Sequence, residues 1–235
     1  MTFARFFGHD RNINLAATMF SIHHLIYAAT AVLTVFLTLK FAKMIHNSVH
    51  EKAFRMGFVI ILVFMELSYH IHNWTFPRFS VPLNICSFAL FMSVYLLFTN
   101  DKRIFKFVFF FGTLGGILAL VLPTTLGYTY YNFRYYHFWL VHSLLIIVPL
   151  YYYAGYEYKV SYKDLINVYL VVVLVTIPIY VFNSIFETNY WFISKIPENV
   201  STFFPNFIIY ILVWYFTVFF SMNLLYFFTK QKPSV

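Results

Sequence analysis

The feature that most constrains this chain is a series of long apolar stretches separated by short polar loops. Each stretch has the roughly 20 mainly apolar residues that an α-helix needs to cross a bilayer. We expect seven transmembrane helices, at about Leu15–Lys40, Met56–Trp74, Ser80–Phe98, Phe105–Leu122, His137–Ala154, Leu165–Asn183 and Phe203–Phe228. The predicted fold is therefore an all-α polytopic membrane bundle of seven helices, with residues 1–235 as one membrane domain.

The composition agrees with a membrane location. Hydrophobic residues make up 61% of the chain and charged residues only 10%, whereas a soluble domain carries about 25% charged residues. We therefore expect a multi-pass protein of the cell membrane, surrounded by membrane lipids. The net charge of +8 does not indicate a nucleic-acid partner, because Lys and Arg lie in short loops where they set topology and meet anionic headgroups. The oligomeric state stays open.

The distribution of basic residues predicts an orientation. The loops after the first, third and fifth predicted helices, together with the C-terminal tail, carry 11 of the 16 Lys and Arg residues, and the other side carries 5. Loops rich in Lys and Arg stay in the cytoplasm. The N-terminus is therefore predicted to lie outside and the C-terminus inside.

Ionisable side chains within the predicted helices gather toward one end. In this topology His24, Glu66, Cys86 and His142 lie in the outer halves of four helices. Glu66, Cys86 and His142 are expected roughly 8–12 Å below the outer interface, and His24 slightly deeper. Ionisable groups in a bilayer are costly and usually face the bundle interior or a water-filled cavity. We expect these four to line one pocket, at a depth that suits the ester region of a phospholipid or the acyl linkage of a lipidated substrate.

Cys86 is the only cysteine, which excludes an intramolecular disulfide and a cysteine-cluster metal site. A buried thiol is inert unless a base takes its proton, and His142 or His24 could form the Cys–His pair used in acyl transfer. The alternative is a small buried thiol that packs like alanine. Glu66 could orient a histidine, act as a base, or simply pair with one.

Several histidines and one glutamate also raise the question of a zinc or iron site. His70 and His72 project about 200° apart on a helix, and no HExxH-type spacing is present. We therefore expect no metal and no cofactor. The last predicted helix, 203–228, contains no lysine, so a retinal Schiff base of the rhodopsin kind has no anchor there.

Blocks along nearly the whole chain resemble the YwaF-like bacterial integral membrane proteins. These blocks are FSIHHL at 20–25, VPLNICSFAL at 81–90, FGTLGGILALVLP at 111–123, FWLVHSLLIIVPLYY at 138–152 and NYWFISKIP at 189–197. The chain departs from the family pattern at Val81, which replaces a Leu, and at Trp191, which replaces a Met. That family is similar to a eukaryotic transmembrane acyltransferase that remodels ether phospholipids. The resemblance implies a catalytic cysteine in the third helix and a histidine in the fifth, which fall on Cys86 and His142.

The leading hypothesis is a membrane acyltransferase or acyl hydrolase that acts on a phospholipid or a lipidated substrate. Cys86 would carry the acyl group as a thioester and His142 would be its base, with His24 and Glu66 tuning or orienting the pair. Substrate contacts are expected from Asn84, His70, His137, Asn183, Asn189 and Tyr190. Of these, Asn84 or Asn183 would donate to the oxyanion.

The alternative function is a non-enzymatic transporter or receptor-like protein that binds a small solute or a lipid in the same polar pocket. A distance measurement separates the two hypotheses. A Cys86 sulfur far from both His142 and His24 would favour binding over catalysis.

Overall fold

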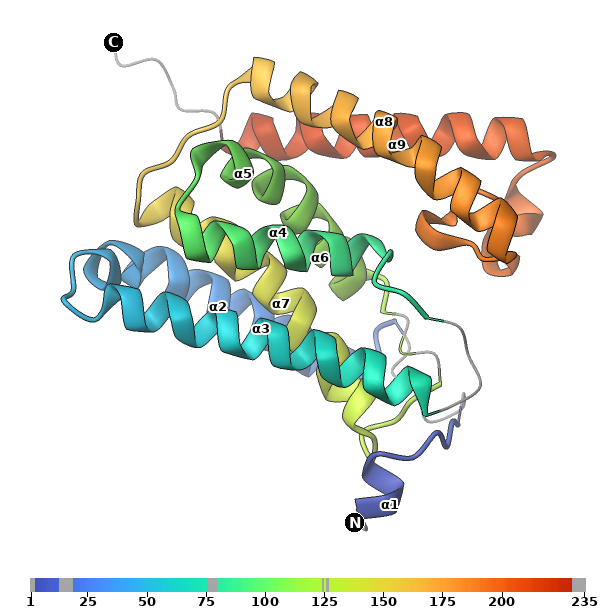
Figure 1. Ribbon diagram of the computed structural model, residues 1–235, viewed down its shortest axis with the longest axis horizontal. Helices are drawn as coiled ribbons and strands as arrows, with labels where there is room; N and C mark the ends of the chain where they lie inside the picture. Colours follow the sequence, from blue (N-terminus) through green and yellow to red (C-terminus); the bar gives the residue numbers. More distant parts are fainter. Residues whose placement is uncertain (1–2, 13–18, 76–79, 124, 126, 230–235) are drawn as a thin grey trace. The chain divides into compact units, whose positions relative to one another are not determined.

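The computed structural model describes residues 3–12, 19–75, 80–123, 125 and 127–229. Within these ranges the regular elements are all helices and no strand occurs (Figure 1). Six helical spans in this part of the chain are long and apolar enough to cross a membrane. They are α2 (Ile22–His46), α3 (Glu51–Trp74), the continuous span Lys102–Val121, α7 (Phe133–Ala154), α8 (Tyr162–Phe186) and α9 (Phe207–Thr229). The chain is therefore a multi-pass membrane protein by length and composition.

The helix expected at Ser80–Phe98 is shorter in the structure. Helix α4 runs from Ile85 to Thr99 and has 15 residues, which is about 22 Å against a hydrocarbon core of about 30 Å. Pro82 explains the late start, because proline removes a backbone donor and holds the preceding residue in an extended conformation. The third of the seven expected spans is thus an apolar helix below the usual spanning length.

The span Lys102–Val121 is continuous but irregular. It consists of α5 (Lys102–Phe107), the π-helical turn η2 (Val108–Gly112) and α6 (Thr113–Val121). Asp101 caps its start, where a carboxylate oxygen accepts from the Arg103 backbone N–H at 2.7 Å. The other short elements are α1 (Phe3–Phe6), η3 (Tyr190–Phe192) and η4 (Glu198–Phe203).

Three predicted helix starts differ in the structure, and side-chain caps mark two of them, at Ser21 and Asn132. Helix α2 begins at Ile22 instead of Leu15, and Ser21 Oγ accepts from the His24 N–H at 3.3 Å. Part of the predicted start, residues 15–18, lies outside the described residues. Helix α3 begins at Glu51, whose acidic side chain suits a first turn. Helix α7 begins at Phe133 instead of His137, because Asn132 Oδ1 accepts from the Arg134 N–H at 2.9 Å.

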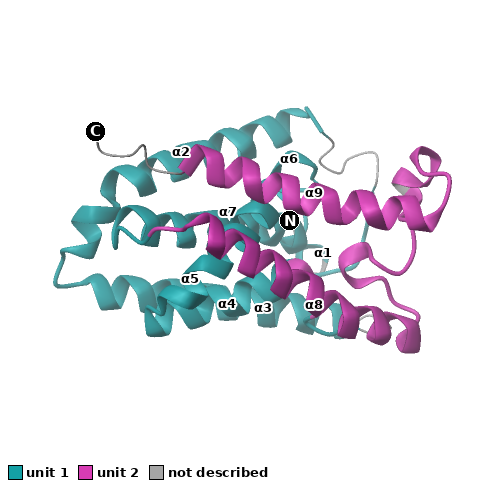
Figure 2. Cartoon of the chain, turned by 90° about the horizontal axis from the view of Figure 1, so that it is seen from above, with its two compact units in different colours: residues 1–82, 86–158 teal, residues 83–85, 159–235 magenta. Residues whose placement is uncertain are grey.

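The chain divides into two compact units (Figure 2). Unit 1 comprises residues 1–82 and 86–158, and unit 2 comprises residues 83–85 and 159–235. In unit 1, α7 packs against both α2 and α6. In unit 2, α8 packs against α9, and Trp191 Nε1 donates to Leu83 O at 2.8 Å. The expectation of one membrane domain stays a prediction.

Gly116 allows α6 to approach α7 closely at His142. A β-carbon added at position 116 would lie 2.7 Å from His142 O and 2.7 Å from Ile146 Cγ1. Small residues at such crossings let helix backbones come together in a membrane protein. The glycine-rich α6 therefore helps to position the histidine that the sequence marks as a base.

Replacing Gly116 with alanine is expected to destabilise the protein by about 1–3 kcal/mol, because the added methyl group overpacks the α6–α7 contact. Thermal unfolding in detergent, followed by circular dichroism, measures the effect. Gly57→Ala is the matched control, because a β-carbon at Gly57 in α3 meets nothing within 4 Å. Equal melting temperatures for the two variants would contradict the close-packing argument.

Candidate functional site

Cys86 and His142 lie in direct contact inside unit 1. Cys86 is in the first turn of α4 and is half-buried, whereas His142 lies in α7 and is buried. The distance from Cys86 Sγ to His142 Nε2 is 2.9 Å. A hydrogen bond of this kind is the geometric requirement for a base that takes the proton of a thiol nucleophile.

The backbone fixes the tautomer of His142. Its Nδ1 lies 2.6 Å from Phe138 O, one turn earlier in α7. A carbonyl oxygen only accepts, so the proton is on Nδ1 and the lone pair is on Nε2. The Cys86 thiol therefore donates to an imidazole nitrogen that is free to take its proton. The ring orientation is set by α7 itself and needs no carboxylate partner.

A second hydrogen-bonded network of buried polar groups starts at Glu66. Glu66 Oε1 accepts from His70 Nε2 at 3.0 Å, one helical turn further along α3. The Ser80 hydroxyl donates to His70 Nδ1 at 3.3 Å and accepts from Asn73 Nδ2 at 3.2 Å. A carboxylate, an imidazole and a hydroxyl in this order can move a proton from the hydroxyl to the imidazole.

The sequence did not predict that Ser80 belongs to this hydrogen-bond network. Ser80 lies ten residues after His70, outside any helical repeat that would pair the two. Ser80 lies in the non-helical segment 80–84 before α4, and its hydroxyl contacts α3 at His70 and Asn73. Glu66, expected to orient the thiol–imidazole pair, is hydrogen-bonded to His70.

Two other expected site histidines are held by backbone carbonyls. His24 Nε2 donates to Leu120 O at 2.9 Å, and His24 Nδ1 accepts from the Phe20 N–H at 2.9 Å. His137 Nε2 donates to Met65 O at 3.1 Å. His24 Nε2 thus joins the start of α2 to the end of α6, and Nδ1 binds the backbone just before α2. The structure places no hydrogen bond from His24 to Cys86 among the described residues.

The remaining expected substrate contacts lie in unit 2. The Asn183 side chain donates to Tyr190 O at 2.9 Å and accepts from the Tyr190 N–H at 2.8 Å. Asn189 Nδ2 donates to Lys195 O at 3.0 Å. These two amides brace the turn after α8, in which Trp191 has a φ of 60°. Asn84 also belongs to unit 2.

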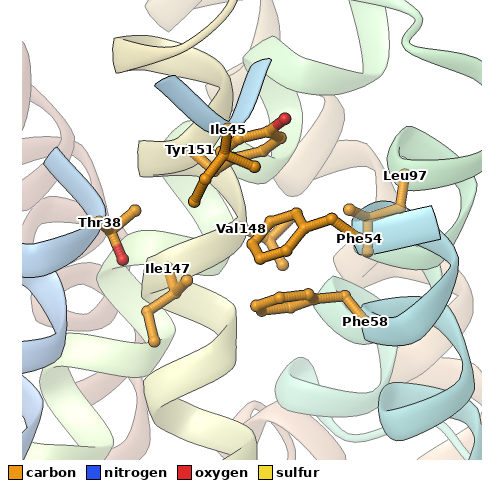
Figure 3. A pocket seen from close by; sticks show the side chains of 8 residues that line it. All are labelled: Thr38, Ile45, Phe54, Phe58, Leu97, Ile147, Val148 and Tyr151. Carbon is orange, nitrogen blue, oxygen red and sulfur yellow. The ribbon is translucent and has the colours of Figure 1, made fainter. Parts of the chain in front are cut away.

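An apolar pocket lies elsewhere in unit 1 (Figure 3). Its empty volume is about 360 Å³, including its open mouth, and its lining residues are Thr38, Ile45, Phe54, Phe58, Leu97, Ile147, Val148 and Tyr151. Neither Cys86 nor His142 lines it. Ile147 follows His142 by five residues on α7, which is about 7 Å along the helix axis. Within the described part of the chain, no three His, Cys, Asp or Glu side chains are placed to hold a metal ion.

Comparison with known proteins gives one match. A family model described as the TMEM164 family matches residues 19–226, which includes every helix of this site. No curated protein and no solved structure matches the chain.

Proposed function

Since the chain belongs to the TMEM164 family of membrane proteins, we propose that it is a membrane-embedded acyltransferase or acyl hydrolase with Cys86 as nucleophile and His142 as base. The observation that carries the proposal is the 2.9 Å contact between Cys86 Sγ and His142 Nε2. The Nδ1 proton of His142 is held by a backbone carbonyl, which leaves Nε2 ready to accept.

The first half-reaction forms a thioester. His142 Nε2 takes the thiol proton while Cys86 Sγ attacks the carbonyl carbon of a lipid ester. The new C–S bond forms, the ester C–O bond breaks, and the imidazolium returns its proton to the leaving alkoxide. The products are acyl-Cys86 and a lipid with one free hydroxyl.

The second half-reaction releases the acyl group. His142 takes the proton of an acceptor hydroxyl, whose oxygen attacks the thioester carbonyl. The C–S bond then breaks, and the Cys86 thiolate recovers the proton from His142. A lysophospholipid as acceptor gives acyl transfer, and water gives hydrolysis. The buried Glu66–His70 pair and Ser80 supply polar contacts for the substrate in the same unit.

The test of this proposal is acyl exchange by the full chain in nanodiscs. The donor is a phospholipid with an isotope-labelled acyl chain, and the acceptor is an unlabelled lysophospholipid. We expect label in the acceptor lipid, or in free fatty acid if water is the acceptor. A rate equal to that of empty nanodiscs would contradict the proposal.

A non-enzymatic, lipid-binding role is the second candidate. The observation that favours it is the apolar pocket in unit 1, because Cys86 and His142 do not line it. A hydrocarbon chain is the ligand that such a lining would bind by burial of apolar surface. Non-covalent retention of lipid without acyl exchange would support this candidate.

The site lies near the outer leaflet of the cell membrane in the topology that we propose. This topology has seven crossings, with α4 as the third, the N-terminus outside and the C-terminus in the cytoplasm. Its support is the excess of Lys and Arg, 11 against 5, on the side proposed to be cytoplasmic.

Two introduced cysteines that flank α4 test both the crossing and the orientation. In a Cys86→Ala background, Thr75→Cys is expected to react with a membrane-impermeant maleimide in intact cells. Lys102→Cys is expected to react only after permeabilisation. The reverse pattern would invert the orientation, and labelling of both sites from one side would show that α4 does not cross.

A further inference from the structure

A positively charged and aromatic cluster lies at the end of unit 1 where α3 ends and α7 begins. Arg134 in α7 is 8% exposed and His72 in α3 is 6% exposed. The guanidinium carbon of Arg134 lies 3.9 Å from the Tyr69 ring centroid and 5.7 Å from that of Tyr128. The His72 ring centroid is 5.7 Å from the same Tyr128 ring. Arg134 and His72 therefore both border Tyr128.

These two side chains have buried polar atoms that the protein leaves unsatisfied. Among the described residues, Arg134 Nε, Arg134 Nη1 and His72 Nδ1 have no hydrogen-bond partner. His72 Nε2 donates to Gly8 O at 3.1 Å. Unpaired buried charges are costly, and such groups in a native protein often mark the position of an ion.

No carboxylate compensates the charge of Arg134. It forms no ion pair within the described residues, and the residues outside the described ranges include no Asp or Glu. Arg11 adds a second cation, with its guanidinium carbon 5.0 Å from the Tyr128 ring centroid. Arg55 shows the contrast, because this other buried arginine is paired with Glu51 at 2.7 Å.

We propose that Arg134, with Arg11 beside it at Tyr128, forms a binding site for a phosphate group, and that this phosphate belongs to a phospholipid headgroup. Guanidinium groups bind phosphate through charge-assisted hydrogen bonds. Arg134 precedes His142 by eight residues on α7, or about 12 Å along the axis. A glycerophospholipid likewise carries its phosphate and its acyl esters at different depths. The lipid source of the phosphate rests on the proposed function, whereas the anion site does not.

Binding to the full chain in a sugar detergent, measured by native mass spectrometry, tests the proposal. The two probes are dioctanoyl phosphatidylcholine and dioctanoylglycerol, which differ in the phosphate-containing headgroup. We expect the wild-type protein to bind the phospholipid at least about tenfold more tightly than the diacylglycerol, because charge-assisted hydrogen bonds are stronger than neutral ones. Arg134→Gln is expected to remove this preference. Equal binding of the two probes by the wild type would overturn the proposal without any variant.

Arg5→Gln is the matched control, because it removes the same charge from an exposed arginine that lies over Tyr131 at 4.1 Å. This control is expected to keep the preference for the phospholipid. Arg134→Lys retains the charge but loses the planar guanidinium, so an intermediate preference is expected. A preference that persists in Arg134→Gln would overturn the site.

Thermal unfolding separates ligand binding from a structural role of Arg134. The phospholipid is expected to raise the melting temperature of the wild type but not that of Arg134→Gln. In lipid-free detergent the variant is expected to melt close to the wild type, because the loss of the cation–π contact with Tyr69 offsets the removal of a buried charge. A variant that melts lower both with and without lipid, and still prefers the phospholipid, would contradict the proposal.

Two further measurements identify the source of the phosphate and distinguish failure of the phosphate site from failure of the proposed enzyme activity. Inorganic phosphate that binds as tightly as the phospholipid would overturn the lipid source. Cys86→Ala is expected to keep the phospholipid preference. Acylation of Cys86 without any phosphate preference would refute this site alone, and a phosphate preference without acyl transfer would refute the enzyme alone.

Discussion

Replacing Cys86 with alanine is expected to lower the rate of acyl transfer by at least about 10⁴-fold, because the variant has no atom that can form the thioester. The rate is measured as transfer of a labelled acyl chain from a phospholipid to a lysophospholipid in nanodiscs. Membrane insertion and the circular dichroism spectrum should not change, because the thiol is a small half-buried group.

Ser93→Ala is the matched control for this prediction. Ser93 is a fully buried residue of α4, and its hydroxyl donates to Ala89 O at 2.8 Å within the same helix. The control removes one small polar group from α4 but none from the proposed reaction. A Cys86→Ala protein that kept the rate of Ser93→Ala would exclude Cys86 as the nucleophile.

Replacing His142 with glutamine is expected to lower the rate by about 10²–10⁴-fold, the usual contribution of a general acid–base group. Glutamine fills a similar volume but cannot take the Cys86 proton. The Cys86 thiol would then stay protonated in its half-buried position and would react slowly. The same transfer assay measures the loss, together with a melting temperature that reports on packing.

His24→Gln provides the comparison with another buried histidine of unit 1. Because both nitrogens of His24 are hydrogen-bonded to the backbone, this variant is expected to lower the melting temperature more than the rate. A stable His24→Gln protein that lost as much activity as His142→Gln would show that His24 belongs to the reacting group, as the sequence suggested.

Apolar length was sufficient to predict where the helices lie, whereas side-chain caps and Pro82 set the starts of α2, α4 and α7. Each of the seven expected stretches contains a helix in the structure. The largest difference concerns α4, where Pro82 delays the start to Ile85 and leaves 15 residues. The Asn132 cap likewise extends α7 upstream of its predicted start and brings Arg134 into the first turn.

The sequence predicted the candidate site less well than the helices, because residue spacing within one helix does not reveal contacts between helices. Cys86 and His142 were selected by their depth and by a family resemblance, and the structure places them 2.9 Å apart. Depth alone also selected His24, whose ring nitrogens turn out to bond to the backbone at Leu120 and Phe20. Which way a histidine points around a helix depends on packing that the sequence does not display.

The polar residues near the end of α8 show the same limit. Asn183 was expected to contact the substrate because it ends an apolar stretch on the same side as the other polar groups. In the structure its amide binds both backbone groups of Tyr190, an arrangement that a tight turn with left-handed residues requires. A polar residue at a helix end can serve the turn, and spacing alone does not separate that role from catalysis.

The most direct test of the account is whether Cys86 forms an acyl thioester. The full chain in nanodiscs is incubated with a phospholipid that carries an alkyne-tagged acyl chain, and the protein is then coupled to a fluorophore. The account predicts a label on Cys86 that hydroxylamine removes, that is absent from Cys86→Ala and that forms more slowly in His142→Gln. A label that persists in Cys86→Ala, or a wild-type protein that acquires none, would contradict it.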